Sequence, residues 1–155
     1  MRSDAALAVL LLLAAAAPAR ASHYPLEEAA FLTGDEVRLL TDRGLEDTEQ
    51  LLAATDTEEE RAALAGTSGL DRKRLRELQE LCDLLQVRGI GPKMAILLRL
   101  SGIYDTRSLA TQKAEPLAAA MKKANDVHQA SEILPEPDVL QGWIEQAAIL
   151  RHPPR

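Results

Sequence analysis

The clearest periodic segment of the chain runs from residue 71 to residue 85. Its apolar residues recur at intervals of three and four positions, at Leu75, Leu78, Cys82 and Leu85. This spacing places them on one stripe and is typical of a helix that buries a single face. The pattern therefore predicts a helix over 71–85 with Cys82 pointing into the core.

The last periodic segment begins at Pro137. A helix over 137–149 places four apolar residues on one face, namely Val139, Trp143, Ile144 and Ala147. The only tryptophan of the chain is therefore expected to fill the core rather than to serve as a ligand platform.

Local chemistry marks further helix starts. Thr57 and Glu60 have the spacing of a capping box, in which each side chain satisfies the other residue's backbone amide, and predict a helix over 58–64. Three prolines stand where a first helical position is expected, namely Pro92, Pro116 and Pro137. Because Pro and Gly fall between the periodic segments rather than inside them, the chain is predicted to be all-α.

The chain also repeats itself at one constant offset. The matched pairs include Leu32 with Ile90, Val37 with Ala95, Gly44 with Gly102, Thr48 with Thr106 and Leu51 with Leu109. Each copy is predicted to form a short helix, a tight turn, a helix that ends at glycine and a threonine-capped helix, with its apolar face buried against the other copy. We expect units at about 25–65 and 70–125, closed by the helix 137–149 and packed as a single domain over 22–150.

The segment 1–21 has the layout of a secretory signal peptide. Arg2 precedes an apolar run over 5–17, and small residues stand at Ala19 and Ala21. Such a run rises about 20 Å as a helix, less than the roughly 30 Å of a bilayer core, which favours a cleaved signal peptide over an uncleaved anchor. We expect cleavage before Ser22 and an exported protein, periplasmic or secreted.

The rest of the chain contains no second apolar run of about 18 residues, so the mature protein is expected to have no membrane span. The segment 22–24 and the tail 151–155 lack periodic apolar positions. Both segments are therefore expected to be flexible.

Composition narrows the chemistry. Of the 155 residues, 46% are hydrophobic but only 3% are aromatic, so the core must be built from Leu, Ala, Ile and Val. One cysteine and three histidines provide neither a disulfide framework nor a ligand cluster for a structural metal. The length allows one compact domain and excludes a large enzyme barrel. We therefore expect no metal and no cofactor.

The segment 87–95 has the sequence of a turn between two helices. Gly89 and Gly91 flank the apolar Ile90, and a new helix is expected at Pro92. Glycine permits positive φ and close backbone approach, the isoleucine anchors the turn in the core, and free amides at the start of the following helix can face an anion. The segment therefore predicts a helix-hairpin-helix turn.

The motifs occur in a recognisable order. They are Arg61–Ala65, Leu81–Pro92, Gly102-Ile103 with Thr106 and Leu109, and Pro137 with Trp143–Ala147. In order and spacing they resemble a bacterial family of tandem helix-hairpin-helix domains that is catalogued only as a domain of unknown function. The resemblance extends from about Pro25 to Leu150; it implies the fold and implies no activity. The first hairpin departs from the pattern, because Leu32–Glu36 holds one glycine and two carboxylates and is poorly suited to phosphate.

Charge is unevenly distributed along the chain. The segment 35–60 holds ten Asp or Glu and two Arg, whereas the segment 61–125 holds twelve Lys or Arg and six Asp or Glu. Helix-hairpin-helix proteins often hold the DNA backbone through hairpin amides and nearby cations. The candidate phosphate-binding residues are Arg88, Gly89, Gly91, Lys93, Arg72, Lys73 and Arg99. The alternative is that these cations lie on solvated helix faces with internal ion pairs such as Arg76 with Glu80.

The acidic segment is the candidate protein-binding face. Its residues are Asp35, Glu36, Asp42, Glu46, Asp47 and Glu49. Faces of opposite charge suit either a charged protein partner or head-to-tail self-association. The net negative charge of the mature chain favours a protein partner over nucleic acid.

No residue pattern announces catalysis. The capping box already accounts for the acidic run 58–60, no two histidines share a helical face, and the 89–93 segment lacks the spacing of a phosphate-binding loop. The sequence therefore predicts an exported, non-enzymatic binding module of the protein-interaction or structural type, with an unknown ligand. Sequence-independent binding of the DNA backbone is the alternative.

Overall fold

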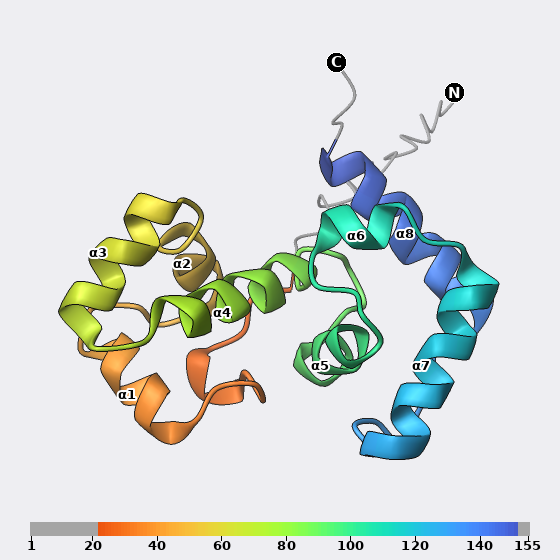
Figure 1. Cartoon of the computed structure of the whole chain (residues 1–155), viewed down its shortest axis with the longest axis horizontal. Coiled ribbons are helices and arrows are strands. Elements are labelled where there is room, and N and C mark those ends of the chain that lie inside the picture. Colours follow the sequence, from red (N-terminus) through yellow and green to blue (C-terminus); the bar gives the residue numbers. More distant parts are fainter. Residues whose placement is uncertain (1–21, 152–155) are drawn as a thin grey trace, which may run out of the picture.

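The computed structural model describes residues 22–151; the predicted signal peptide, 1–21, and positions 152–155 of the predicted tail lie outside this range. Within it the chain is all-α, as predicted, and contains no strand (Figure 1). The elements are the 3-10 helix η1 (Leu26–Glu28) and the helices α1 (Gly34–Thr41), α2 (Thr48–Ala53), α3 (Glu58–Ser68), α4 (Arg72–Leu84), α5 (Pro92–Leu100), α6 (Thr106–Ala110), α7 (Ala114–His128) and α8 (Pro137–Arg151). No helix of the described range is long and apolar enough to cross a membrane.

The internal repeat of the sequence corresponds to a repeat of helices in the structure. The offset that aligns Gly44 with Gly102 also aligns the first residue of α1, Gly34, with that of α5, Pro92, and the start of α2 with the start of α6. The backbone bonds that shape the turns repeat in the same register: Leu45 N–H donates to Leu40 C=O as Ile103 N–H donates to Leu98 C=O. The two segments therefore adopt the same local conformation.

Helix α4 links the two repeated segments. Figure 1 shows α1, α2 and α3 grouped around one end of α4, and α6, α7 and α8 beyond its other end. Helix α4 packs against α2 and α3 on one side and α5 on the other, while α8 packs against α6 and α7. The candidate binding surfaces lie on these two groups of helices.

The core contains the residues that the helical stripe of α4 predicted. Leu75, Leu78, Cys82 and Leu85 are all buried. Trp143 is also buried, as expected, together with Ile144 and Ala147 of the same helix. Val139 was expected on this face and is instead 46% exposed, because the buried stripe of α8 begins at Leu140 and one residue turns a helix by about 100°.

Three predicted helix boundaries need correction. Helix α3 continues past residue 64 to Ser68. Pro116 is the third residue of α7 rather than its first, which a proline tolerates because the first-turn amides have no partner inside the helix. The closing helix extends beyond residue 149 to Arg151, the first residue of the predicted tail. The Arg151 guanidinium lies 3.4 Å from Asp83 Oδ2, and a cation in the last turn also interacts favourably with the helix dipole.

The prediction that the segment 22–24 has nowhere to dock is wrong for Tyr24. Its N–H donates to Thr48 Oγ1 over 3.1 Å, and its carbonyl accepts the Thr48 N–H over 2.9 Å. The extended segment before η1 is thereby bonded to the start of α2. Apolar periodicity gave no sign of this contact, because backbone atoms make it.

Asp83 provides the equivalent contact at the start of α6. Its Oδ2 accepts both the N–H and the hydroxyl of Thr106, each over 2.7 Å, and its Oδ1 accepts the side-chain amide of Gln86. Thr48 and Thr106 occupy matching positions in the two repeated segments, and both are buried. A backbone segment therefore satisfies the first threonine and a buried carboxylate satisfies the second.

We expect Asp83→Ala to lower the free energy of unfolding by about 3 kcal/mol, because it leaves the buried amide and hydroxyl of Thr106 without an acceptor. Urea unfolding followed by circular dichroism measures the loss. Asp126→Ala is the control: Asp126 forms an exposed pair with Lys122 on the preceding turn of α7, so its removal should cost about 0.5 kcal/mol or less. Equal losses in the two variants would contradict the role assigned to Asp83.

Candidate functional site

The predicted phosphate-binding residues fall into separate places. Arg88, Gly89, Gly91 and Lys93 surround the turn between α4 and α5, whereas Arg72 and Lys73 lie in the first turn of α4. At about 1.5 Å per residue, the length of α4 separates Lys73 from the hairpin by roughly 17 Å or more. Arg99 lies in the last turn of α5. The hairpin group alone is contiguous.

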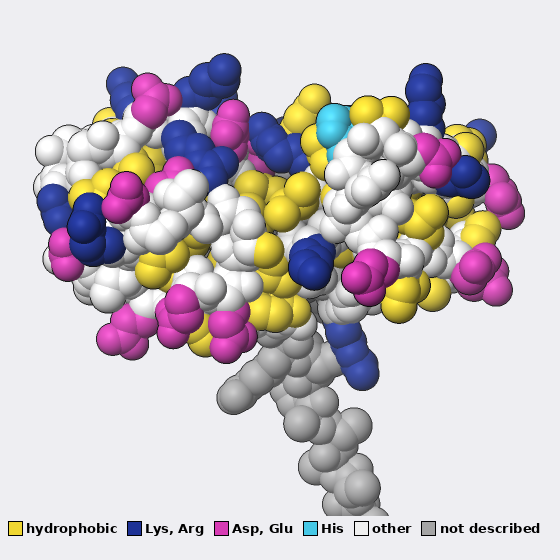
Figure 2. All heavy atoms as spheres, turned by 90° about the horizontal axis from the view of Figure 1, so that it is seen from below, with side chains coloured by type: hydrophobic (Ala, Val, Ile, Leu, Met, Phe, Trp, Pro, Cys, Tyr) yellow, Lys and Arg dark blue, Asp and Glu magenta, His cyan; other side chains and the backbone are white. Residues whose placement is uncertain are grey.

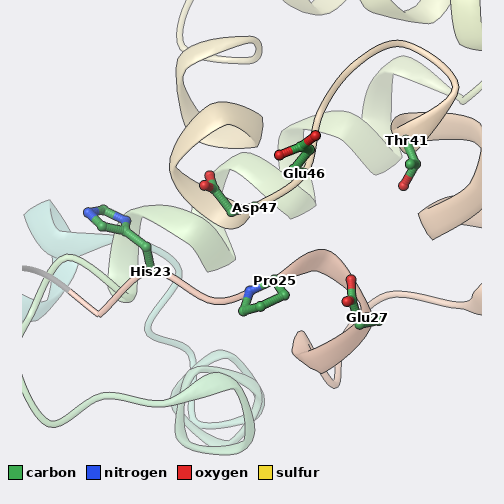
Figure 3. Close-up of a pocket in the computed structure, with 6 residues that line it drawn as sticks. All are labelled: His23, Pro25, Glu27, Thr41, Glu46 and Asp47. Carbon is green, nitrogen blue, oxygen red and sulfur yellow. The ribbon is translucent and has the colours of Figure 1, made fainter.

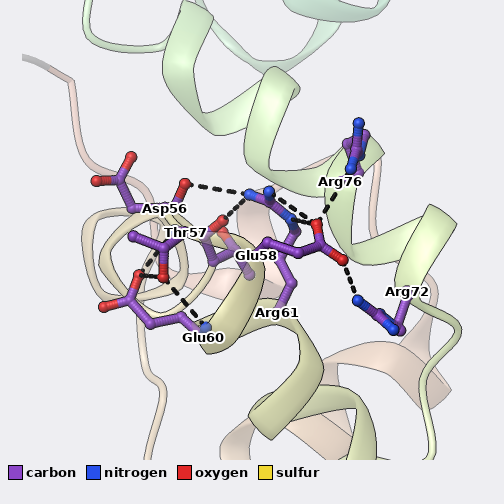
Figure 4. A network of polar contacts seen from close by, with 8 residues as sticks. Asp56, Thr57, Glu58, Glu60, Arg61, Arg72 and Arg76 are labelled. Carbon is purple, nitrogen blue, oxygen red and sulfur yellow. Dashed lines mark hydrogen bonds and ion pairs between the residues drawn. The ribbon is translucent and has the colours of Figure 1, made fainter.

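Glu58 gathers three arginines around one carboxylate. Figure 4 shows the guanidinium groups of Arg61, Arg72 and Arg76 converging on it. The Arg72 hydrogen bond, followed by that of Arg61, holds the pKa of Glu58 below its usual value. The expected pair of Arg76 with Glu80 is wrong, because a carboxylate from α3 lies within reach of Arg76.

Arg74 connects α4 to α1. Its Nε donates to Glu36 Oε1 over 2.7 Å, its Nη2 donates to Glu36 Oε2 over 3.0 Å, and Nη2 also reaches the Phe31 carbonyl. This two-point contact lowers the pKa of Glu36 and raises that of Arg74. Glu36 was predicted for the acidic face, but its carboxylate is occupied inside the molecule.

Arg99 is paired in a similar way. It lies against Glu77 and Glu80 of α4, and its guanidinium stacks on the Tyr104 ring with 4.9 Å to the centroid. On the face shown in Figure 2, Lys and Arg side chains accordingly lie among Asp and Glu side chains rather than in one positive patch. Four arginines of the segment 61–125 are therefore paired with carboxylates of other helices, namely Arg72, Arg74, Arg76 and Arg99.

The hairpin is closely packed against the last helix. Gly89 has φ +95°, and Ile90 is fully buried. The Arg88 N–H donates to the Gln146 side chain over 3.0 Å, and a Cβ on Gly89 would lie 2.9 Å from Trp143 Nε1. Sequence reasoning assigned no role to Gln146, although this residue lies inside the Trp143–Ala147 motif.

The start of α5 differs from the starts of the neighbouring helices. Gly91 precedes it and offers no side-chain cap, whereas Thr33 caps α1 in the first repeated segment. Arg88 and Lys93 are exposed beside this helix start, and among the described residues neither pairs with a carboxylate. The first turn of α5 is thus the one place in the described range where predicted cations and uncapped amides meet.

Several carboxylates of the predicted acidic face do not form ion pairs with Lys or Arg in the described range. Within the described range, no Lys or Arg pairs with Asp42, Glu46 or Glu49; Glu49 has only His23, at 3.7 Å. Asp35 pairs with Arg38, and Asp47 caps α2 by accepting the Gln50 N–H. Four of the six residues of the predicted acidic face, namely Asp42, Glu46, Asp47 and Glu49, therefore have no Lys or Arg partner within the described range.

Two neighbouring grooves are lined by several of these carboxylates, although Asp42 lines neither groove. The first has a volume of about 500 Å³ and is lined by His23, Pro25, Glu27, Thr41, Glu46 and Asp47 (Figure 3). The second, of about 430 Å³, is lined by His23, Glu49, Leu52, Ala53, Asp56, Glu60, Asp83 and Gln86. His23 borders both grooves. Sequence reasoning missed His23 and Glu27, because they precede the acidic run along the chain.

The remaining ionisable group with a shifted pKa has a structural explanation. Burial, with a smaller effect of the neighbouring Asp83, raises the pKa of the Cys82 thiol to about 12. The thiol is therefore protonated at neutral pH and poorly suited to act as a nucleophile. In the part of the chain that the structure describes, no three His, Cys, Asp or Glu side chains are placed to hold a metal ion.

Comparison with known proteins gave one match. A family model described as a domain of unknown function (DUF4332) matches residues 31–150. No curated protein and no solved structure matches the chain. The match therefore supplies a family without supplying an activity.

Gly89→Ala should destabilise the protein more than Gly102→Ala. Both glycines have positive φ, which costs alanine about 1 kcal/mol or more, but a Cβ meets open space at Gly102 and the Trp143 ring at Gly89. We expect a loss of about 1 kcal/mol for Gly102→Ala and at least about 2 kcal/mol for Gly89→Ala. Urea unfolding measures both, and the tryptophan emission should shift only in Gly89→Ala. Identical losses with unchanged emission would show that the hairpin does not press on α8.

Proposed function

The chain belongs to the family described as a domain of unknown function (DUF4332), and we propose that it is an exported, non-enzymatic binding module whose ligand is a protein with a positively charged surface. In this proposal the segment 1–21 forms the signal peptide, and the segment 22–150 forms one domain of two helix-hairpin-helix units. The tightly turned Gly89–Gly91 segment and the matching helix starts of the internal repeat support the two units. The apolar run 5–17 supports export.

One observation carries the choice of ligand: several arginines are paired with carboxylates between helices, whereas carboxylates of the first groove have no Lys or Arg partner among the described residues. Arg72, Arg74 and Arg99 are each bonded to carboxylates of other helices. Glu27 and Glu46, by contrast, line an open groove without a Lys or Arg partner among the described residues. Exposed charges of one sign attract a partner of the opposite sign and raise the rate of association.

The ionisable groups with shifted pKa values favour a binding function over catalysis. The shifted pKa values of Glu36, Glu58 and Arg74 follow from ion pairs that hold helices together, and that of Cys82 follows from burial. A general acid or base is usually tuned by its surroundings and left open to substrate. Among the shifted groups of the described range, Glu36, Glu58 and Arg74 are engaged in ion pairs and Cys82 is buried, which favours a structural role over acid–base catalysis.

Photocrosslinking in the living cell tests whether a protein binds at the carboxylate-lined grooves. A photoreactive amino acid replaces Thr41, an exposed residue of the first groove, and a second strain carries it at Gln141, an exposed residue of α8. We expect a discrete protein adduct from position 41 and none of the same mass from position 141. The double substitution Glu46→Lys with Glu49→Lys should abolish the adduct, because it reverses the charge that attracts the partner.

Glu59→Lys is the matched control, since Glu59 is exposed but lines neither groove. It should leave the adduct intact. Absence of any adduct at position 41, or an adduct that survives the double substitution, would refute the acidic surface as the binding site.

A second candidate function is binding of the DNA backbone at the hairpin. The observation that favours it is the uncapped start of α5 beside Arg88 and Lys93. Amides at a helix N-terminus and two nearby cations are the usual elements of a phosphate contact. The hairpin offers few such cations, because most of the other predicted ones are paired with carboxylates.

Fluorescence anisotropy of a short labelled DNA duplex distinguishes binding of a protein partner from binding of the DNA backbone. Under the protein-partner proposal we expect no binding at physiological salt and no difference between the wild type and Lys93→Glu at low salt. Binding that weakens with salt, is lost in Lys93→Glu and Arg88→Glu, and persists in Lys123→Glu would instead establish the hairpin as a phosphate site. Lys123 is exposed on α7, away from the hairpin.

A further inference from the structure

A groove with two arginines lies where α6 packs against α8. Its volume is about 590 Å³, and it is lined by Arg107, Ala110, Thr111, Ala148 and Arg151. Arg107 has no carboxylate partner among the described residues, whereas Arg151 shares Asp83 with Thr106. We call this the arginine groove.

Small apolar side chains lie between the two arginines of the groove. They are Ala110 of α6 and Ala148 of α8, whereas the exposed Ile149 and Leu150 point away from the groove, because each residue turns a helix by about 100°. Guanidinium groups bind carboxylates through paired hydrogen bonds, and exposed apolar side chains gain by contact with others. The groove therefore suits a ligand that carries both carboxylates and aliphatic side chains.

The turn between α7 and α8 has this chemistry. Val127 and Ile133 are 72% and 77% exposed, and Val139 at the start of α8 is exposed as well. Three carboxylates accompany them in the segment 132–138, at Glu132, Glu136 and Asp138. Figure 2 views the molecule from the side of this turn, and hydrophobic side chains lie there beside Asp and Glu side chains.

The turn is held in shape by its own hydrogen bonds. Asn125 donates to the Ser131 carbonyl and accepts the Ser131 N–H, both over 2.9 Å. The Ser131 hydroxyl donates to the Ile133 carbonyl over 2.7 Å, and Gln129 turns the chain in the left-handed conformation. A turn that is already ordered loses little conformational entropy when it binds.

The two surfaces lie at opposite ends of one helix. Asp138 stands in the first turn of α8 and Arg151 at its end, so the helix separates them by about 20 Å. The turn therefore cannot reach the arginine groove of its own molecule. A second copy of the chain brings both surfaces together.

We propose that this protein associates head to tail, with the α7–α8 turn of one copy seated in the arginine groove of the next. Carboxylates of the turn meet Arg107 and Arg151, and Ile133 meets Ala110 and Ala148 between them. The contact joins two different surfaces, so it forms a ring if the rotation closes and a filament if it does not. The contact uses no residue of the predicted acidic face. The proposal of self-association therefore does not depend on the protein partner proposed for that face.

Sedimentation velocity of the purified protein tests the association. The average mass should rise with protein concentration and fall with added salt, because carboxylate–guanidinium contacts are screened. Ile133→Ser removes the apolar contact of the turn, and Arg107→Glu reverses the charge of the groove. Each variant should weaken self-association by about tenfold or more, as the loss of a central interface residue does.

A mixture of the two variants gives the decisive result. The intact turn of Arg107→Glu can bind the intact groove of Ile133→Ser, so equal amounts of both should form a heterodimer and stop there. An association between two identical surfaces would instead leave the mixture no better than its components. A wild type that stays monomeric at all concentrations, or a mixture without heterodimer, would overturn the proposal.

Matched control variants test whether self-association depends specifically on the α7–α8 turn and the arginine groove. Leu100→Ser and Lys113→Glu change an exposed apolar residue and an exposed cation outside both surfaces, and both should associate like the wild type. Far-UV circular dichroism checks that the exposed substitutions leave the helices intact. The variant with Glu46→Lys and Glu49→Lys should still associate, and Ile133→Ser should still give the adduct at position 41, so either proposal can fail without the other.

Discussion

Ion pairs between α4 and its neighbouring helices determine which charged side chains on the surface are left without a partner. Arg74 holds Glu36 of α1 with two hydrogen bonds, and Glu58 of α3 binds Arg72 and Arg76. Exposed ion pairs stabilise proteins by only about 0–1 kcal/mol each, so the apolar face of α4 carries most of the stability. Their larger effect is on charge: the pairs occupy Glu36 and Glu58 together with the arginines that bind them, whereas Glu46 has no Lys or Arg partner among the described residues.

The all-α class, the burial of Cys82 and Trp143, and the internal repeat all followed from apolar spacing along the chain. These features were predictable because periodicity records which side of a helix is buried. Asp83 was not predictable, because nothing local connects its carboxylate to the amide of Thr106, which lies beyond the whole of α5 in the sequence. Val139 was misplaced for a simpler reason: Val139 and Leu140 are both apolar, and only packing against α6 and α7 decides which one turns inward.

The candidate site was predicted less well than the fold, and the reason is electrostatic. Counting charges along the sequence identified Arg72, Arg99 and Lys93 as equivalent cations. Their partners come from elsewhere: Arg72 meets Glu58 of α3, and Arg99 meets Glu80 of α4. Tertiary packing alone therefore determines that Lys93 faces solvent while the other two are paired. The carboxylates that line the first groove required the same information, because they come from separate segments.

The two repeated segments have diverged at the positions that matter for binding. Where the second has Gly89 with positive φ, the first has Phe31 without it; where α1 has its Thr33 cap, α5 has Gly91 and no cap. Of the two turns, the second is thus the one followed by a helix without a side-chain cap, and it is also the one packed against Trp143 of α8. Helix α8 thereby supports the hairpin along one side and ends in the arginine groove. Helix α8 therefore links the turn at Gly89 to the groove lined by Arg151, whereas Glu46 and Glu49 belong to the first segment.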